Sequence, residues 1–408
     1  MHQPAPDRQP RVLHLTQPVD GGVARVVTDL ARAQLAAGLR VTVACPAGPL
    51  TETLVALGAD VRRWEAARAP GAALPGEVRR LARVVGAVRP DLVHAHSAKA
   101  GLAGRLAVRG RIPTVFQPHA WSFEAVGGAM AALSLKWERL GARWAHRLVC
   151  VSEAERETGQ RAGVTARYRV IPNGIDPGRF RPAPADSVRT ALLPGLDPAP
   201  LVVCVGRLCR QKGQDVLLAA WDTVRARVPG ARLVLVGDGP DGAALRAGAP
   251  ESVLFAGAVD EAAPWYRAAD LVVLPSRWEG MALAPLEAMA CGRPVVVTDV
   301  DGARESLPPG SAEHCLVPAG RPGALAGAVA GLLLDAPLRA SLGRRARRHV
   351  LATHDVRHTA ERFADLYREL LGTRPAAGRA TDTGRGAPEA GPDVGRAEPT
   401  ECRESIHS

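Results

Sequence analysis

The chain has 408 residues, more than one ordinary hydrophobic core accommodates, and 47% of them are apolar, so it can bury two cores. It contains no run of about 18 apolar residues, and its polar N-terminus lacks the apolar centre of a signal peptide. These features argue against a membrane-spanning or secreted class and lead us to expect a cytoplasmic protein. The seven cysteines show neither metal-ligand nor disulfide-scaffold spacing, so we interpret them as reduced and structural.

The net charge of +11 is concentrated in the first half of the chain. Residues 1–183 hold 26 Lys and Arg against 14 Asp and Glu, whereas the remainder holds 26 against 27. A basic surface can attract nucleic acid, an anionic membrane or an acidic substrate. No nucleic-acid-binding motif accompanies it, so we expect no nucleic-acid partner. A peripheral contact with anionic lipid at the inner face of the membrane and a soluble arginine-rich surface remain alternatives.

Strand patterns alternate with helix patterns along the first half. The predicted strands cover residues 11–16, 41–45, 60–64, 91–95, 113–116 and 148–151. The predicted helices cover residues 21–37, 50–57, 76–88, 129–145 and 154–162. Because Trp137 and Trp144 lie seven apart on one face of the helix at 129–145, we expect that helix to belong to the core. The alternation predicts a doubly wound parallel sheet, which binds ligands outside the carboxyl ends of its strands.

Candidate site residues follow three of these strands. Gly21 and Gly22 open a helix after the first strand, a phosphate or close-approach signal that is weak alone. His119 follows the strand at 113–116. His94 lies inside a strand and is interpreted as a hydrogen-bonded core histidine. Three further candidates follow that strand: Ser97, Lys99 and Gly101.

The second half repeats the alternation after a proline-rich run at 177–184, which we interpret as an interdomain linker. The predicted strands cover residues 201–205, 232–236, 252–255, 271–274 and 295–297. The predicted helices cover residues 214–227, 262–269, 286–291, 323–334, 337–351 and 356–371. Residues 373–408 contain few large apolar side chains, so we expect a disordered tail.

A basic pair follows the strand at 201–205. Arg207 and Lys212 lie five apart in a loop bounded by Gly206 and Gly213, where they could grip a pyrophosphate from two sides. A basic pair in a loop is more often solvent-exposed without function. However, the chain has only three lysines among its 52 basic residues, and one of them is Lys212.

The most informative stretch lies between the apolar runs at 271–274 and 295–297, which read as buried parallel strands. Pro285 is tolerated in the first turn of a helix that residues 286–291 continue, and Gly292 suits the position after its end. The stretch therefore predicts a strand, a loop, a short helix and a strand.

Two carboxylates flank this loop and helix. Glu279 falls in the loop and Glu287 on the helix, while Gly280 and Ala282 carry little bulk, so backbone N–H groups at the helix start could meet a phosphate. Taken singly, each glutamate would be interpreted as a solvated turn or helix residue. Carboxylates accept hydrogen bonds from vicinal hydroxyls, so the pair predicts a sugar-nucleotide site.

This block resembles the signature of family 4 retaining glycosyltransferases of the GT-B fold, which has two glutamates eight positions apart, the second followed by Ala-Met-Ala. The resemblance implies that Glu279 holds hydroxyls of the donor sugar and that Glu287 holds the ribose. It also implies that backbone contacts to the sugar and diphosphate come from Gly280, Met281, Ala282 and Leu283.

The resemblance extends over roughly residues 11–371. It implies that Arg207 and Lys212 neutralise the leaving nucleoside diphosphate, that His119 contacts the donor sugar, and that the base is contacted by main chain near 257–259. Further positions that match the family are Gly21, Gly22 and the turn glycine Gly237. An Asp-x-Asp occurs at 299–301, but we interpret it as a strand-end turn rather than a metal site, so we expect no metal or other cofactor.

The sequence therefore predicts an α/β protein with two Rossmann-like, doubly wound parallel-sheet domains facing across a cleft. We place a flexible N-terminus at 1–10, an acceptor domain at 11–183, a donor domain at 184–354, a helix crossing back to the first domain at 355–371 and the tail at 372–408. The expected reaction is retaining transfer of a hexosyl unit from a UDP- or GDP-linked sugar to a glycan, lipid-linked or small-molecule acceptor. A non-hydrolysing sugar-nucleotide epimerase and a non-catalytic sugar-nucleotide-binding protein are the alternatives.

Overall fold

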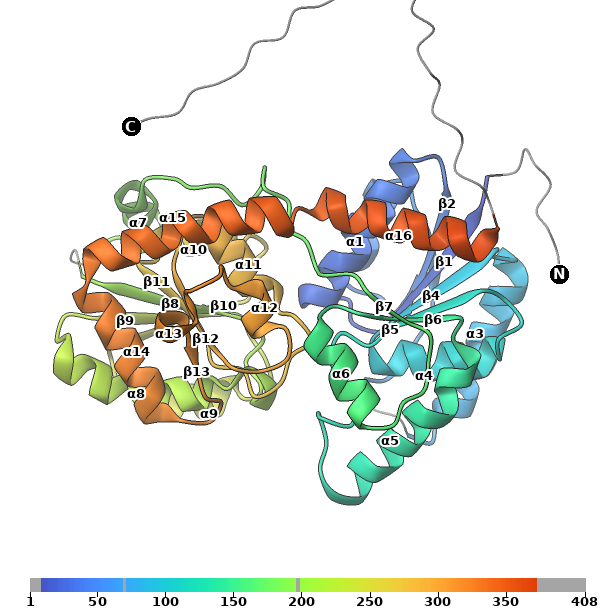
Figure 1. Cartoon of the computed structure of the whole chain (residues 1–408), viewed down its shortest axis with the longest axis horizontal. Helices are drawn as coiled ribbons and strands as arrows, with labels where there is room; N and C mark the ends of the chain where they lie inside the picture. Colours follow the sequence, from blue (N-terminus) through green and yellow to red (C-terminus); the bar gives the residue numbers. More distant parts are fainter. Residues whose placement is uncertain (1–8, 69–70, 196–198, 373–408) are drawn as a thin grey trace, which may run out of the picture. The chain divides into compact units, whose positions relative to one another are not determined.

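The computed structural model describes residues 9–68, 71–195 and 199–372, which form two parallel β-sheets with helices on their faces (Figure 1). The predicted α/β fold class is confirmed. The predicted flexible N-terminus and disordered tail fall, apart from residues 9, 10 and 372, outside the described residues.

The first sheet has seven parallel strands in the order β3-β2-β1-β4-β5-β6-β7. The strands are β1 (Arg11–Thr16), β2 (Arg40–Cys45), β3 (Asp60–Arg63), β4 (Leu92–His96), β5 (Thr114–Gln117), β6 (Arg147–Cys150) and β7 (Tyr168–Val170). The strand order reverses between β1 and β4, so their carboxyl ends form the point where a doubly wound sheet binds ligands.

The helices of this sheet follow its strands along the chain. They are α1 (Gly21–Ala36), α2 (Pro49–Ala56), α3 (Leu74–Val88), α4 (Ser97–Val108), α5 (Gly128–Gly141) and α6 (Glu153–Arg161), with a 3₁₀ turn at Ala142–Trp144. Ser152 is the N-cap of α6, and its hydroxyl accepts a hydrogen bond from the Glu155 amide at 3.0 Å, as helix-capping serines do.

The second sheet has six parallel strands in the order β10-β9-β8-β11-β12-β13, so its switch point lies between β8 and β11. The strands are β8 (Leu201–Val205), β9 (Arg232–Val236), β10 (Val253–Gly257), β11 (Leu271–Leu274), β12 (Val295–Thr298) and β13 (Leu316–Val317). Every residue of β11 and β12 is buried, as their continuous apolar sequence predicts.

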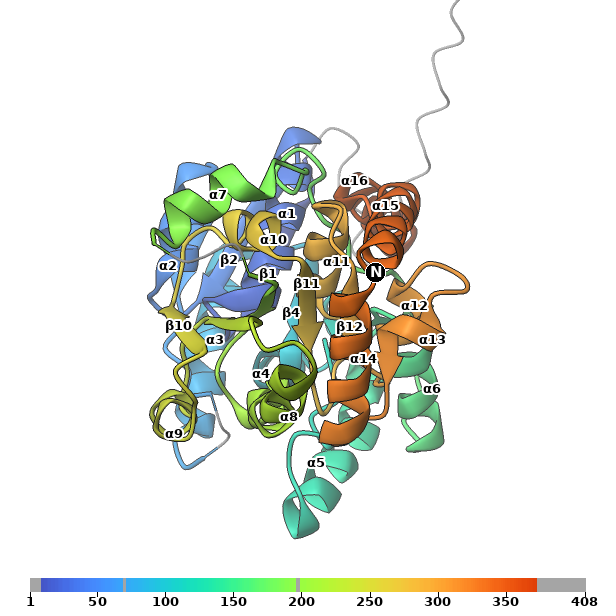
Figure 2. The ribbon, with the colours of Figure 1, turned by 90° about the vertical axis from the view of Figure 1, so that its left-hand side faces the viewer.

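Ten helices accompany or follow this sheet in the described ranges. They are α7 (Ala185–Leu192), α8 (Gln214–Arg227), α9 (Gly242–Ala247), α10 (Ala263–Ala268), α11 (Leu283–Ala290), α12 (Ala303–Ser306), α13 (Ala312–Cys315), α14 (Pro322–Leu334), α15 (Ala336–Thr353) and α16 (Val356–Leu371). α8 packs against α14, and α11 packs against α15 (Figure 2).

Several sequence expectations need correction. α11 begins three residues before the predicted helix, with Pro285 in its first turn. The 12-residue helix α4 was not predicted. β7 and the short elements α7, α9, α12, α13 and β13 were also not predicted, because elements this short carry little periodic signal. The helix expected at 129–145 ends at Gly141, and only one face of it is in the core: Trp137 is half-buried, whereas Met130 and Leu133 are 55% and 60% exposed.

The last helix, α16, packs against α1 and β4 of the first sheet (Figure 1). The Tyr367 hydroxyl oxygen lies 2.6 Å from Nδ1 of His94. At the start of α16, Ile175 and residues 354–356 exchange backbone hydrogen bonds of 2.8 and 3.0 Å. The domain boundaries themselves remain predictions.

No single helix among the described residues is long and apolar enough to cross a bilayer, although α14 and α15, which meet at a 101° bend, satisfy the length and composition criteria as a pair. Six cysteines in the described ranges are free, and five of them are buried.

Gly101 and Gly86 provide a test of how tightly the first sheet is packed. A Cβ at Gly101 in α4 would lie 2.1 Å from Cε2 of Phe116, whereas a Cβ at Gly86 in α3 would meet nothing within 4 Å. We expect Gly101→Ala to lower the free energy of unfolding by about 1–3 kcal/mol through overpacking. Gly86→Ala should raise it by about 0.5–1 kcal/mol through helix propensity. Urea unfolding of both variants measures the two effects. Equal changes in the free energy of unfolding would contradict the close packing of Gly101 against Phe116.

Candidate functional site

The loops that follow β8 and β11 are joined along their length. A Cβ at Gly213, whose φ is +68°, would lie 2.1 Å from the Pro275 carbonyl oxygen, so only glycine fits this approach. The Arg277 amide donates to the Gln211 carbonyl at 2.7 Å, and the Gln211 side-chain amide donates to the Trp278 carbonyl at 3.1 Å. The two strand ends at the switch point therefore present one continuous surface.

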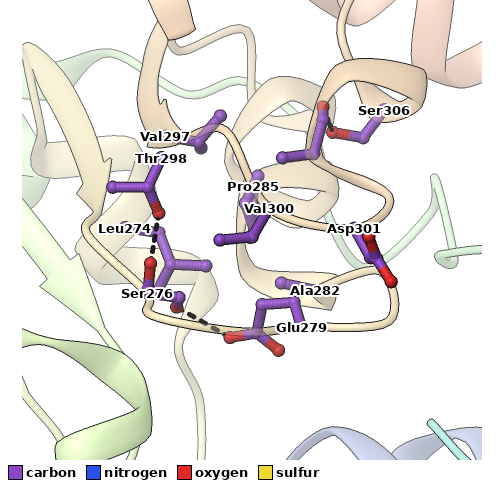
Figure 3. A pocket seen from close by; sticks show the side chains of 11 residues that line it. Leu274, Ser276, Glu279, Ala282, Pro285, Val297, Thr298, Val300, Asp301 and Ser306 are labelled. Atoms are coloured by element: carbon purple, nitrogen blue, oxygen red, sulfur yellow. Dashed lines mark hydrogen bonds between the residues drawn. The ribbon is translucent and has the colours of Figure 1, made fainter. Parts of the chain in front are cut away.

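Two predicted site residues meet on this surface. Lys212 Nζ lies 2.6 Å from Oε1 of Glu279, and the Ser276 hydroxyl donates to the same carboxylate oxygen at 2.7 Å. Glu279 is 7% exposed and lines a pocket with Asp301 and Ser306 (Figure 3). The ion pair holds the Glu279 carboxylate in one orientation beside the lysine.

Arg207 lies half-buried in the same loop as Lys212. Its carbonyl oxygen accepts a hydrogen bond from the side-chain amide of Gln214 at 3.0 Å. Within the three described ranges its guanidinium has no ion-pair partner. A Cβ at Gly237 would lie 2.2 Å from the Gly206 carbonyl oxygen, so Gly237 allows the end of β9 to approach this loop.

The segment 280–283 forms the N-terminus of α11. Its N-cap is Ala282, which offers no side-chain cap, so the first amide groups of the helix are left without an internal acceptor. On the opposite side of the backbone, the Gly280 carbonyl accepts from the Ser152 hydroxyl at 2.9 Å and the Met281 carbonyl accepts from the Asn173 amide at 2.8 Å. These bonds fix the segment against the first sheet's loops.

Gly280 lies too close to its neighbours for a side chain. A Cβ there would lie 2.7 Å from Oε1 of Glu155, 2.9 Å from Cγ2 of Val151 and 3.0 Å from the carbonyl carbon of His119. Gly22, at the start of α1, is also brought to this region, because its Cβ would lie 3.7 Å from Cδ1 of Leu283. Two predicted elements of the first half therefore contact the predicted donor segment.

Glu287 is 5% exposed and has two partners. Its Oε2 accepts from the Tyr266 hydroxyl at 2.7 Å, and its Oε1 accepts from Nη1 of Arg25 at 2.6 Å. The Arg25 guanidinium also lies 5.4 Å from the ring centroid of Phe180. Sequence reasoning missed Arg25 and Tyr266; the only signal for Arg25 was its place in the first turn of α1, three residues after Gly22.

His119 adopts a strained backbone conformation. Its φ is +60° and that of Ala120 is +131°, values that side-chain-bearing residues rarely adopt outside functional turns. Its Nε2 lies 3.2 Å from Nδ1 of His96, and burial lowers the pKa of His119 to about 3. The imidazole is therefore neutral at physiological pH.

Two of the three candidates on α4, Lys99 and Gly101, serve its packing. Lys99 is 4% exposed, and its Nζ lies 2.6 Å from Oε2 of Glu77 on α3. Gly101 packs beneath Phe116. Ser97 is the first residue of the helix, at a φ of +65°. A buried lysine needs a paired charge, so the expectation that Lys99 serves the ligand site is wrong.

Three histidines could in principle hold a metal ion. His14, His94 and His96 are fully buried and offer ring nitrogens within 4.8 Å of one another. However, Nδ1 of His14 and Nε2 of His96 already lie at hydrogen-bonding distance from each other, 3.0 Å. The Asp-x-Asp forms no such group, since the Asp299 carboxylate pairs with Arg304 at 2.7 Å.

A cluster of carboxyl groups lies behind Gly280. Burial raises the pKa of Glu155 to about 8 and that of Glu124 to about 7, and it also raises the pKa of Asp301. The negative charge of Asp301 raises the first two further. Glu155 keeps Oε2 on the Val151 amide at 2.7 Å. The Glu155 side chain is therefore protonated at neutral pH.

We expect Glu155→Gln to change the pH dependence of stability. The folded-state pKa of about 8 exceeds the ordinary glutamate pKa of 4.5, so the stability that protonated Glu155 contributes is lost as pH rises from 4.5 to 8. Glutamine does not titrate, so the free energy of unfolding of the variant should rise relative to that of the wild type by about 1.4 kcal/mol per pH unit over this window. Urea unfolding at pH 5, 6.5 and 8 measures this gain. Glu157→Gln, on the exposed side of α6, is the matched control. If the difference in free energy of unfolding between Glu155→Gln and the wild type stays constant from pH 5 to pH 8, the raised pKa of Glu155 is contradicted.

Comparison with known proteins identifies both halves of the chain. A profile described as Glycosyltransferase Family 4 matches residues 20–179, and one described as Glycosyl transferases group 1 matches residues 199–335. The D-inositol 3-phosphate glycosyltransferase of Acidothermus cellulolyticus is 32% identical over 376 residues, which cover 84% of this chain and 79% of that protein.

A second relative is the lipopolysaccharide core biosynthesis mannosyltransferase LpsB of Rhizobium meliloti, 35% identical over 228 residues. This match covers 52% of the chain and 64% of that protein, so the chain spans just under two-thirds of its length.

Solved structures show the same arrangement of elements. The crystal structure of HepE from Anabaena in complex with UDP and glucose superposes with a TM-score of 0.76 at 25% identity, covering 88% of this chain and all of that one. Because both halves match family profiles and one relative aligns over most of both chains, this chain belongs to glycosyltransferase family 4 and adopts the GT-B fold.

Proposed function

We propose that the protein transfers a hexosyl unit, with retention at the anomeric carbon, from a nucleoside-diphosphate sugar to a glycan, lipid-linked or small-molecule acceptor. The observation that carries the proposal is the 2.6 Å pair of Lys212 and Glu279 at the β8/β11 switch point. Glu279 lies in the loop that leads into the uncapped N-terminus of α11, and Lys212 lies in the adjoining loop after β8. A cation, an open helix N-terminus and a carboxylate are the groups that a diphosphate and a sugar diol require.

In this proposal catalysis is charge stabilisation at the leaving diphosphate. Arg207, Lys212 and the first amide groups of α11 stabilise the negative charge that grows as the glycosidic bond breaks. Glu279 is already oriented by Lys212 and Ser276, so it can accept from sugar hydroxyls without reorganisation. The departing phosphate takes the proton of the attacking hydroxyl on the same face of the sugar. No metal ion is required in this scheme.

Glu287 is proposed to hold the ribose. An ionised carboxylate offers about four acceptor sites. Arg25 and Tyr266 occupy one on each oxygen, so acceptor capacity remains for a vicinal diol. Since Arg25 comes from α1 of the first sheet, the ribose site would draw on both halves of the chain.

The relatives bear on substrates without deciding them. One relative is named as a mannosyltransferase of lipopolysaccharide core biosynthesis and another as a D-inositol 3-phosphate glycosyltransferase, while HepE was crystallised with UDP and glucose. These cover a glycan acceptor and a small-molecule acceptor. A panel of UDP- and GDP-linked sugars, assayed for diphosphate release, selects the donor. The relatives are transferases, which does not favour the epimerase; a changed sugar on incubation without acceptor would favour it.

We expect Lys212→Ala to lower kcat about 100-fold, because it removes one of the two cations proposed to stabilise the leaving diphosphate. Glu287→Gln should raise the donor KM about 10-fold while keeping the side-chain shape. Steady-state diphosphate release measures both.

Arg210→Ala is the matched control for the lysine, since Arg210 is exposed and lies with Lys212 in a 3₁₀ turn, Arg210–Lys212. Wild-type turnover should also persist in EDTA. Unchanged activity in Lys212→Ala and Glu287→Gln together would refute the assignment of the site.

We also propose that α5 contacts an anionic membrane. Three of its apolar side chains are exposed, Met130, Leu133 and Leu140, at 55%, 60% and 45%. Its one acidic residue, Glu138, is buried in an ion pair with Arg105, so the exposed charges of this helix are basic. Apolar groups among cations are what an anionic lipid interface attracts.

The double variant Met130→Gln, Leu133→Gln should lower binding to phosphatidylglycerol-containing vesicles about 10-fold, because it removes two apolar side chains that would otherwise be buried in the lipid interface. Vesicle co-sedimentation measures this. Val55→Gln on α2, where Val55 is 60% exposed, is the control and should bind like the wild type. Equal binding by the double variant would contradict the proposal.

A further inference from the structure

We propose that a chain of buried side chains, Gln34, His14 and His96, fixes the tautomer of His119 so that its Nδ1 is presented as a hydrogen-bond acceptor for a hydroxyl of the bound sugar. The three are positioning residues, and the inference rests on the proposed function only for the identity of the ligand. The chain starts on α1, crosses β1 and the end of β4, and reaches the loop after β5 (Figure 1).

The contacts form one continuous path. Oε1 of Gln34 lies 2.8 Å from Nε2 of His14, and Nδ1 of His14 lies 3.0 Å from Nε2 of His96. Nδ1 of His96 in turn lies 3.2 Å from Nε2 of His119. His14 and His96 are fully buried, and Gln34 is 7% exposed. Each ring therefore uses one nitrogen toward α1 and the other toward the site.

The direction of the path is set at Gln34. The Tyr367 hydroxyl lies 2.6 Å from Nδ1 of His94, a short distance that suits an O–H donor. Because that hydroxyl donates its O–H to His94, its oxygen accepts from the Gln34 side-chain NH₂, 3.5 Å away. The amide oxygen of Gln34 then faces His14 and can only accept.

Every other proton position follows because the imidazoles are neutral. Burial lowers the pKa of His14 to about 4 and of His119 to about 3, and it lowers that of His96 well below its ordinary value. A neutral imidazole has one N–H. His14 must donate from Nε2 to Gln34, so His96 donates from Nε2 to His14, and His119 donates from Nε2 to His96. The Nδ1 of His119 is left with its lone pair.

The consequence is a chemical preference at the site. A lone pair accepts from a hydroxyl but repels a phosphate oxygen, so His119 would read the sugar end of the donor and not its diphosphate. The position fits this, because the His119 main chain lies against Gly280 in the proposed donor segment. Within the described ranges, Nδ1 of His119 has no hydrogen-bond partner.

Histidine ¹⁵N NMR of the ligand-free protein at pH 7.5 tests the inference directly. We expect His14, His96 and His119 all to carry their proton on Nε2, with signals assigned from the spectrum of His119→Gln. A proton on Nδ1 of His119, or an even mixture of tautomers, would overturn the inference. So would a metal ion that co-purifies in stoichiometric amount and shifts the His14 and His96 signals.

Variants of Gln34 then link the tautomer to binding. Gln34→Leu removes the acceptor at the start of the hydrogen-bonded path, so His119 should become a mixture of its two tautomers. The donor KM should then rise about 5-fold, with kcat changed less than about 2-fold. Gln34→Glu keeps an acceptor oxygen, so the His119 tautomer and the donor KM should both be like those of the wild type. Tyr367→Phe removes the hydroxyl that orients the Gln34 amide, so it should also give His119 a mixture of tautomers.

The two proposals fail separately. If the tautomers are as expected but no sugar nucleotide binds, the proposed function is wrong, while the hydrogen-bonded path from Gln34 to His119 is still supported. If the donor binds and turns over while Gln34→Leu leaves both KM and the His119 spectrum unchanged, the positioning role is wrong and the proposed function stands.

Discussion

The structure depends on the absence of a side chain at Gly280. This residue lets the loop after β11 lie against Glu155, Val151 and the main chain of His119, closer than any Cβ could approach. The carbonyl groups of the loop are then held by Ser152 and by the amide of Asn173. With its carbonyls engaged on one side, the segment can present the open N-terminus of α11 on the other.

Around this contact, both glutamates of the proposed site are paired with cations. Lys212 orients Glu279, and Arg25 orients Glu287, each at 2.6 Å. Paired groups of this kind are preorganised. A ligand can therefore place its hydroxyls on the carboxylates and its phosphate oxygens on the cations with little rearrangement of the side chains. The same region contains Glu155, protonated because burial raises its pKa to about 8, which avoids a bare negative charge beside the loop.

Much of the arrangement was predictable from local patterns. The alternation of strand and helix signals predicts both parallel sheets, and the switch-point rule places the loops with Gly21, Lys212 and Glu279 at their carboxyl ends. The exposed apolar face of α5 and the burial of Lys99 were not predictable, because periodicity states which residues share a face but not what covers that face. The site assignments carried over from the family remain predictions.

The sequence by itself determined the fold class, the family and the spacing of the two glutamates, because these depend on local periodicity and short motifs. Only the tertiary structure decided that Arg25 pairs with Glu287 across 262 positions and that Gln34, His14 and His96 lead to His119. Such partners come from different strands and helices, and their contacts depend on strand register and packing, which no local pattern encodes.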